Sequence, residues 1–167
     1  MSFSLLPKLM TDRLTDLNAA FLRTRHIRLL MLDFDNTIVP YTTDIPSAEM
    51  AAWLKDMGAS GVPLCVVSNS RNDRVKKFCE AYGLNCITHA RKPFSDGIRR
   101  CLDEYGLAPE DCALVGDQIF TDTLGANCAG VCSILVKAIH NHTWYLKLRH
   151  VAELPFILIA KNRRIQL

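Results

Sequence analysis

Short apolar runs alternate with helix-forming segments through most of this chain. Each run has the length of a buried strand, and the segments between runs carry helix signals such as proline in the first turn or glycine after the last. The predicted strands cover residues 27–34, 62–67, 86–88, 112–115 and 132–136. The predicted helices cover residues 46–57, 70–82, 93–105 and 121–129. This alternation predicts an α/β fold in which helices cover both faces of a parallel sheet.

Length and composition are typical of one soluble domain. The chain has 167 residues, 49% of them hydrophobic, which is enough to bury a core and argues against disorder. Its longest apolar stretch, residues 154–160, contains a proline, whereas a membrane-crossing helix needs about 20 apolar residues. Seven cysteines without a Cys-x-x-Cys pair favour free thiols in a reducing compartment. We therefore expect a single cytoplasmic domain over residues 1–167.

Charge is distributed unevenly along the chain. Residues 31–136 hold nine Lys or Arg against fourteen Asp or Glu, whereas residues 137–167 hold six Lys or Arg and one Glu. The acidic middle suits a metal site, and the basic C-terminal segment suits an anionic partner or simply a solvated surface. Within residues 1–26, apolar side chains recur at helical spacing. They predict an N-terminal amphipathic helix that covers a sheet edge or touches a membrane.

Polar side chains follow four of the predicted strands, at the edge where sheets of this kind bind ligands. The residues concerned are Asp33, Asp35, Ser68, Asn69, Lys92, Asp117 and Asp122. Four carboxylates repel one another unless a cation neutralises them, and ligation by oxygen atoms alone favours Mg²⁺. A metal, a lysine and neutral donors together suit a phosphoryl group, whose charge must be offset on all sides. Each motif alone is commonly a turn or a helix cap, but their order at successive strand ends makes chance a poor explanation.

These residues resemble the four motifs of the haloacid dehalogenase (HAD) superfamily of phosphatases and phosphotransferases. The matching stretches are Asp33-Phe-Asp35-Asn-Thr37, Ser68-Asn69, Lys92-Pro93 and Gly116-Asp117 through Asp122. The resemblance implies a three-layer, Rossmann-like fold and Mg²⁺-dependent phosphoryl transfer. It makes Asp33 the nucleophile, which forms an aspartyl-phosphate. It makes Asp35 the acid that protonates the leaving group and then the base that activates water.

The resemblance also implies the roles of the remaining polar residues. Ser68 and Asn69 would hold the phosphoryl oxygens, while Lys92 would balance their charge and orient the nucleophile. The metal ligands would be Asp33, the backbone carbonyl of Asp35, and Asp117. Asp122 would be either a further metal ligand or a residue that supports the ligands without binding the metal itself.

The spacing of the motifs leaves no room for the cap domain that many HAD enzymes carry. The segments from Asp35 to Ser68 and from Ser68 to Lys92 are filled by the predicted elements alone. We therefore expect an open site, which suits a large or surface-bound substrate or an enzyme closed by a second subunit.

A narrower resemblance covers residues 33–40, 91–93 and 115–127, which look like bacterial YqeG-type proteins of HAD subfamily IIIA. That group is related to the mitochondrial phosphatidylglycerophosphate phosphatases, and residues 162–164 are similar to its basic tail. It implies that the enzyme dephosphorylates a lipid-linked substrate, phosphatidylglycerophosphate, to phosphatidylglycerol in phospholipid biosynthesis. It also implies peripheral contact with the inner face of an anionic membrane. No nucleic-acid partner is expected. The alternatives are a soluble phosphatase for a sugar phosphate, nucleotide or other small phosphate ester, and a non-catalytic adaptor.

Overall fold

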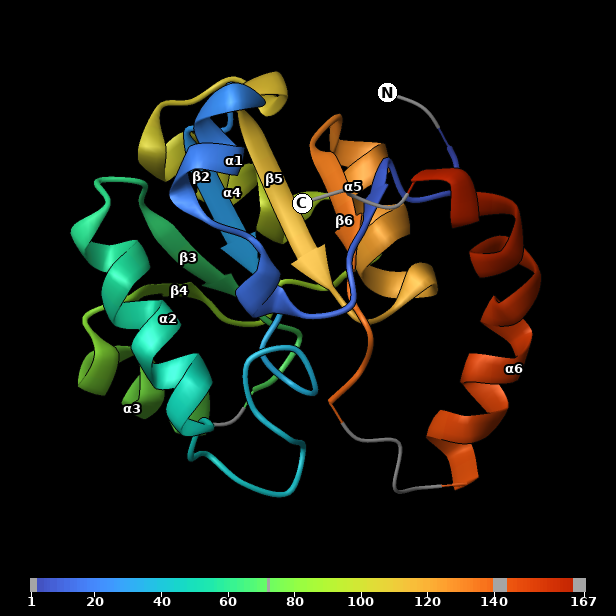
Figure 1. The fold of residues 1–167 in the computed structure, drawn as a ribbon, viewed down its shortest axis with the longest axis horizontal. Coiled ribbons are helices and arrows are strands. Elements are labelled where there is room, and N and C mark those ends of the chain that lie inside the picture. Colours follow the sequence, from blue (N-terminus) through green and yellow to red (C-terminus); the bar gives the residue numbers. More distant parts are fainter. Residues whose placement is uncertain (1–2, 72, 140–143, 164–167) are drawn as a thin grey trace.

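A six-stranded parallel sheet runs through the middle of the molecule (Figure 1). The computed structural model describes residues 3–71, 73–139 and 144–163. The strand order is β1-β6-β5-β2-β3-β4, and every neighbouring pair is parallel, as the alternation of the sequence predicts. The strands are β1 (Leu9–Met10), β2 (Leu29–Leu32), β3 (Leu64–Val67), β4 (Asn85–Ile87), β5 (Cys112–Gly116) and β6 (Cys132–Leu135).

Helices cover both faces of this sheet and one of its two lateral edges. They are α1 (Ala19–Thr24), α2 (Ala48–Ala59), α3 (Asp73–Tyr82), α4 (Asp96–Tyr105), α5 (Leu124–Ala129) and α6 (Trp144–Ile159). Successive side chains of a strand point to opposite faces, so β2 feeds two separate cores. Leu30 and Leu32 pack in the cluster that contains residues of α1, α2 and α3. Leu29 and Met31 pack in the cluster that contains residues of α4 and α5.

The described chain contains no inserted cap domain, in agreement with the spacing of the motifs. Between β2 and β3 the chain forms the single helix α2, and between β3 and β4 it forms α3. The result is a three-layer, Rossmann-like fold whose strands all end at the same edge (Figure 1).

The expected amphipathic helix over residues 1–26 is wrong. Instead the segment forms the edge strand β1, a short 3-10 turn at Leu14–Asp16 and the six-residue helix α1. The backbone N–H of Lys8 donates to the carbonyl of Ser133 (3.1 Å), which pairs the segment with β6. Pairing with β6 satisfies backbone groups at a sheet edge that would otherwise stay open, and the helical spacing of apolar residues carries no information about that edge.

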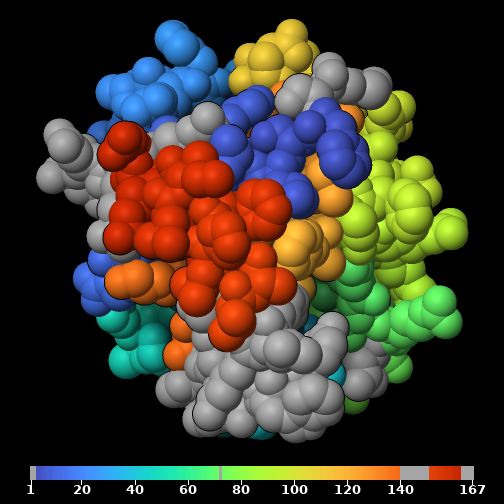
Figure 2. Space-filling view, turned by 90° about the vertical axis from the view of Figure 1, so that its right-hand side faces the viewer, coloured from blue at the N-terminus to red at the C-terminus, as the bar shows by residue number. Residues whose placement is uncertain are grey.

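The basic C-terminal segment, residues 137–167, contains the 16-residue helix α6. Residues 140–143 and 164–167 of that segment lie outside the described residues. The end of α6 and the turn after it pack on the β1 side of the sheet, where Phe156 and Ala160 contact a cluster with Met10 and Leu135. Figure 2 shows this part of the chain at the surface, beside the N-terminal segment. None of the helices described is long and apolar enough to cross a membrane.

Trp53 joins α2 to the N-terminal segment. Its indole Nε1–H donates to the backbone carbonyl of Leu17 at 2.6 Å, and the ring is buried. We predict that Trp53→Phe lowers the free energy of unfolding by about 1–3 kcal/mol, because the variant leaves a buried carbonyl without its donor and part of the ring volume empty. Urea unfolding followed by circular dichroism measures this change. An unchanged unfolding midpoint would contradict it.

Candidate active site

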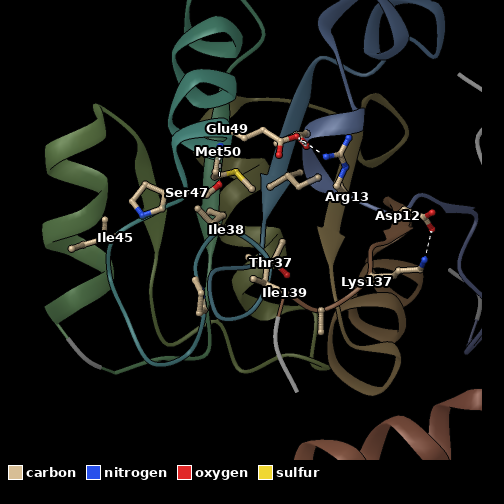
Figure 3. Close-up of a pocket in the computed structure, with 15 residues that line it drawn as sticks. Asp12, Arg13, Thr37, Ile38, Ile45, Ser47, Glu49, Met50, Lys137 and Ile139 are labelled. Carbon is tan, nitrogen blue, oxygen red and sulfur yellow. Dashed lines mark hydrogen bonds and ion pairs between the residues drawn. The ribbon is translucent and has the colours of Figure 1, made fainter. Parts of the chain in front are cut away.

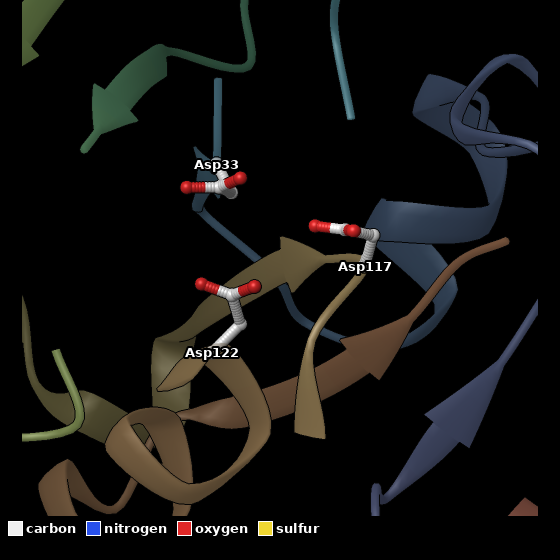
Figure 4. Close-up of side chains that lie close together, drawn as sticks. All are labelled: Asp33, Asp117 and Asp122. Carbon is white, nitrogen blue, oxygen red and sulfur yellow. The ribbon is translucent and has the colours of Figure 1, made fainter. Parts of the chain in front are cut away.

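Three carboxylates meet at the carboxyl ends of the two central strands β2 and β5. Asp33 follows β2, Asp117 follows β5, and Asp122 lies in the π-helical turn Ile119–Thr123 that leads into α5. One ligand atom from each carboxylate lies within 4.8 Å of the other two, and all three residues are buried. Figure 4 shows the three side chains around a common space. They meet because β2 and β5 are hydrogen-bonded neighbours that end at the same edge.

Lys92 lies against two of these carboxylates. Its Nζ donates to Asp33 Oδ1 at 2.6 Å and to Asp122 Oδ1 at 2.7 Å, and its side chain is 1% exposed. Burial alone would lower the pKa of Lys92, but the charges of Asp122 and Asp33 outweigh burial and raise it, so the amine stays protonated. Burial raises the pKa of Asp33 to about 7, against the attraction of Lys92. One lysine therefore supplies too little positive charge to keep the Asp33 carboxylate fully ionised at neutral pH.

The donor set fits a hard divalent cation. Three buried acidic side chains converge, and Lys92, which contacts two of them, contributes one positive charge. Oxygen ligands of this kind are those that Mg²⁺ prefers. A cation among them would favour the ionised form of Asp33.

Gly116 makes the approach of Asp122 feasible. A Cβ atom at this position would collide with the Asp122 carboxylate, so only glycine fits. Asp122 Oδ2, the carboxylate oxygen that does not bond Lys92, accepts from the backbone N–H of Gln118 at 3.1 Å. Together these contacts hold Asp122 beside β5.

Ser68 and Asn69, which follow β3, have different surroundings. The buried Ser68 hydroxyl accepts from the backbone N–H of Ser70 (3.1 Å) and keeps its own proton to donate. The Asn69 amide bonds the backbone of Lys92 twice: its Nδ2 donates to the carbonyl at 2.8 Å, and its Oδ1 accepts from the N–H at 2.7 Å. The Asn69 side chain thus secures the segment that carries the lysine.

The Asp35 carboxylate is not part of the cluster formed by Asp33, Asp117 and Asp122. Its Oδ1 accepts from Arg74 Nη1 at 2.9 Å, and Arg74 in α3 also bonds Asp44 and the carbonyl of Thr43. Burial raises the pKa of Asp35, although Arg74 opposes this effect. Sequence reasoning missed Arg74, because an arginine in the first turn of a surface helix carries no signal that it reaches the loop after β2.

Comparison with known proteins identifies relatives of this chain. Residues 2–139 match the family described as mitochondrial PGP phosphatase. A protein of Bacillus subtilis (strain 168), described as probable phosphatase YqeG, is 36% identical over 115 residues. That alignment covers 69% of this chain and 67% of the relative.

Solved structures resemble the fold at low sequence identity. The cobalt-bound deoxy-D-mannose-octulosonate 8-phosphate phosphatase of Haemophilus influenzae has a TM-score of 0.54 and 10% identity, over 82% of this chain and 91% of that one. A HAD-superfamily hydrolase of Ehrlichia chaffeensis has a TM-score of 0.53 and 14% identity, over 78% of this chain and 98% of that one. The family match, the bacterial relative and the shared fold agree, and the chain therefore belongs to the mitochondrial PGP phosphatase family and is a phosphatase with the HAD fold.

Proposed function

We propose that this phosphatase works through a covalent phosphate on Asp33, with Mg²⁺ held by Asp33, Asp117 and the backbone carbonyl of Asp35. The observation that carries the proposal is the convergence of Asp33, Asp117 and Asp122 within 4.8 Å of one another beside a buried lysine. When bound, Mg²⁺ would offset the negative charge that otherwise keeps a phosphate ester away from a carboxylate nucleophile. Asp122 lies close enough to be a further ligand or to orient Lys92.

In the first step, an Asp33 oxygen forms a bond to phosphorus while the bond from phosphorus to the alcohol oxygen breaks. The leaving alcohol takes a proton from Asp35, whose raised pKa suits an acid that must be protonated when substrate binds. In the second step, Asp35 takes a proton from water as the water attacks phosphorus. The bond to Asp33 breaks, inorganic phosphate is released, and both aspartates return to their starting states.

The phosphoryl oxygens need donors besides the metal. The Ser68 hydroxyl, buried after β3, is the side-chain donor that we assign to them. The Asn69 side chain is engaged by the Lys92 backbone. We therefore assign the backbone N–H of Asn69, rather than its side chain, as the second donor. Lys92 balances the charge of the transferred group and orients Asp33 through its 2.6 Å contact.

The substrate that we propose is phosphatidylglycerophosphate, hydrolysed to phosphatidylglycerol. The match to the mitochondrial PGP phosphatase family supports it. The fold of the described residues also supports it, because a site without a cap can receive a headgroup that stays attached to a lipid. A soluble phosphatase for sugar phosphates or nucleotides is the alternative. The substrate that the enzyme hydrolyses with the highest kcat/KM distinguishes the two.

Contact with an anionic membrane would bring the enzyme to such a substrate. Four apolar side chains from the middle to the end of α6 are exposed: Val151, Leu154, Leu158 and Ile159. The sequence from residue 137 to the C-terminus holds six Lys or Arg and one Glu. Apolar side chains beside basic ones are the features by which a helix lies on an anionic bilayer.

The first test measures phosphate release from phosphatidylglycerophosphate, a panel of sugar phosphates and nucleotides, and p-nitrophenyl phosphate. We expect Asp33→Asn to lower kcat by roughly a thousandfold or more on every substrate that the wild type hydrolyses, because an amide cannot replace the attacking carboxylate. We expect the highest kcat/KM for phosphatidylglycerophosphate.

Asp103→Asn is the matched control, since this exposed aspartate of α4 belongs to none of the motifs and should leave kcat unchanged. Near-wild-type turnover by Asp33→Asn would refute the covalent mechanism. A clear preference for a soluble ester would refute the lipid substrate and support the alternative.

Metal binding can be tested without any substrate. At about 100 times its dissociation constant, Mg²⁺ should stabilise the fold by about 2.7 kcal/mol, which corresponds to a rise of roughly 5–10 °C in Tm. Removal of the metal with EDTA should reverse the rise. Asp117→Asn should abolish it, and an equal rise in that variant would exclude Asp117 as a ligand.

Membrane contact predicts sedimentation with vesicles that contain phosphatidylglycerol, and less sedimentation as salt increases. The double variant Leu158→Ser/Ile159→Ser should bind roughly tenfold more weakly, because two exposed apolar side chains no longer enter the bilayer. Vesicles of phosphatidylcholine alone are the control. Equal binding of the double variant and the wild type would show that α6 is not the membrane contact.

A further inference from the structure

A buried glutamate of α6 contacts the segment that joins two of the clustered aspartates. Glu153 is 2% exposed. Its Oε1 accepts from the backbone N–H of Ile119 at 2.9 Å and from that of Phe120 at 3.4 Å. These two residues begin the π-helical turn that follows Asp117 and contains Asp122.

The two amides lie at the start of a helical turn, where backbone N–H groups have no acceptor within the helix. Later amides of the same turn bond within the chain: those of Asp122 and Thr123 both donate to the carbonyl of Gln118. Glu153, which belongs to α6 and not to the turn, therefore supplies the acceptor for these two N–H groups. A buried carboxylate is costly unless it is hydrogen-bonded, and these amides provide the bonds.

Packing at the same place joins α6 to the turn. The rings of Phe120 and Phe156 meet edge to face, with centroids 6.1 Å apart. Ile119 is completely buried in the cluster that Phe156 and Ala160 contact. The turn thus rests on α6 through two hydrogen bonds and an apolar contact.

We propose that Glu153 is a positioning residue for the metal site, and this rests on the proposed function. By holding the amides of Ile119 and Phe120, Glu153 fixes the turn between Asp117 and Asp122 and so sets the spacing of their carboxylates. Residues that hold or orient metal ligands commonly affect the affinity for the metal in this way. Glu153 lies beyond residues 2–139, the stretch that matches the family, so α6 adds this support from outside the matched region.

The test is calorimetric titration of the full chain with Mg²⁺ alone, together with turnover of p-nitrophenyl phosphate. We expect Glu153→Ala to weaken Mg²⁺ binding roughly 10–100-fold and to raise by a similar factor the Mg²⁺ concentration that gives half-maximal turnover. Glu153→Gln should stay within about threefold of the wild type, because its amide oxygen accepts the same two hydrogen bonds.

Loss of stability must be separated from loss of positioning. Trp53→Phe, which destabilises the opposite side of the molecule, is the control and should leave Mg²⁺ affinity unchanged. The inference is overturned if Glu153→Ala binds Mg²⁺ within twofold of the wild type, or if Glu153→Gln binds as weakly as Glu153→Ala. A wild-type chain that binds no Mg²⁺ and releases no phosphate would instead refute the proposed function.

Discussion

The buried contact of Lys92 with Asp33 and Asp122 is the interaction on which the site depends. Without it, three carboxylates would face one another in a region from which water is largely excluded, and their repulsion would oppose the fold. The protein also secures the lysine through its backbone, which Asn69 bonds on both sides. One lysine offsets only part of the negative charge, and the remaining negative charge makes the site suitable for a cation, which in turn would attract a phosphoryl group.

Contacts from several distant segments keep this charged arrangement in place. Gly116 lets Asp122 approach β5, Arg74 reaches from α3 to Asp35, and Glu153 reaches from α6 to the turn that contains Asp122. The face beside the site is shaped by the N-terminal segment and the loop after β2. Together with the start of α2 and residues 137–139, they line an open pocket of about 750 Å³, in which Arg13 and Glu49 form an ion pair (Figure 3).

Much of the fold could be predicted because local pattern and tertiary environment agree in the central strands. Runs such as residues 112–115 are apolar because both faces of β5 are buried, so composition alone marks them. The N-terminal segment shows the opposite case. Its apolar spacing matches a helix, but the free edge of β6 offered hydrogen bonds that no periodicity within residues 1–26 could indicate.

Between residues 27 and 136 the sequence by itself determined the order of strands and helices and the polar residues that follow four of the strands, because both are local features of residue type and spacing. From these the parallel sheet and its ligand-binding edge follow. Only the tertiary structure decided that β2 and β5 are neighbours, that the Asn69 side chain bonds backbone, and that Arg74 and Glu153 reach the site. Those contacts join residues far apart in the chain, and their partners depend on how whole elements pack.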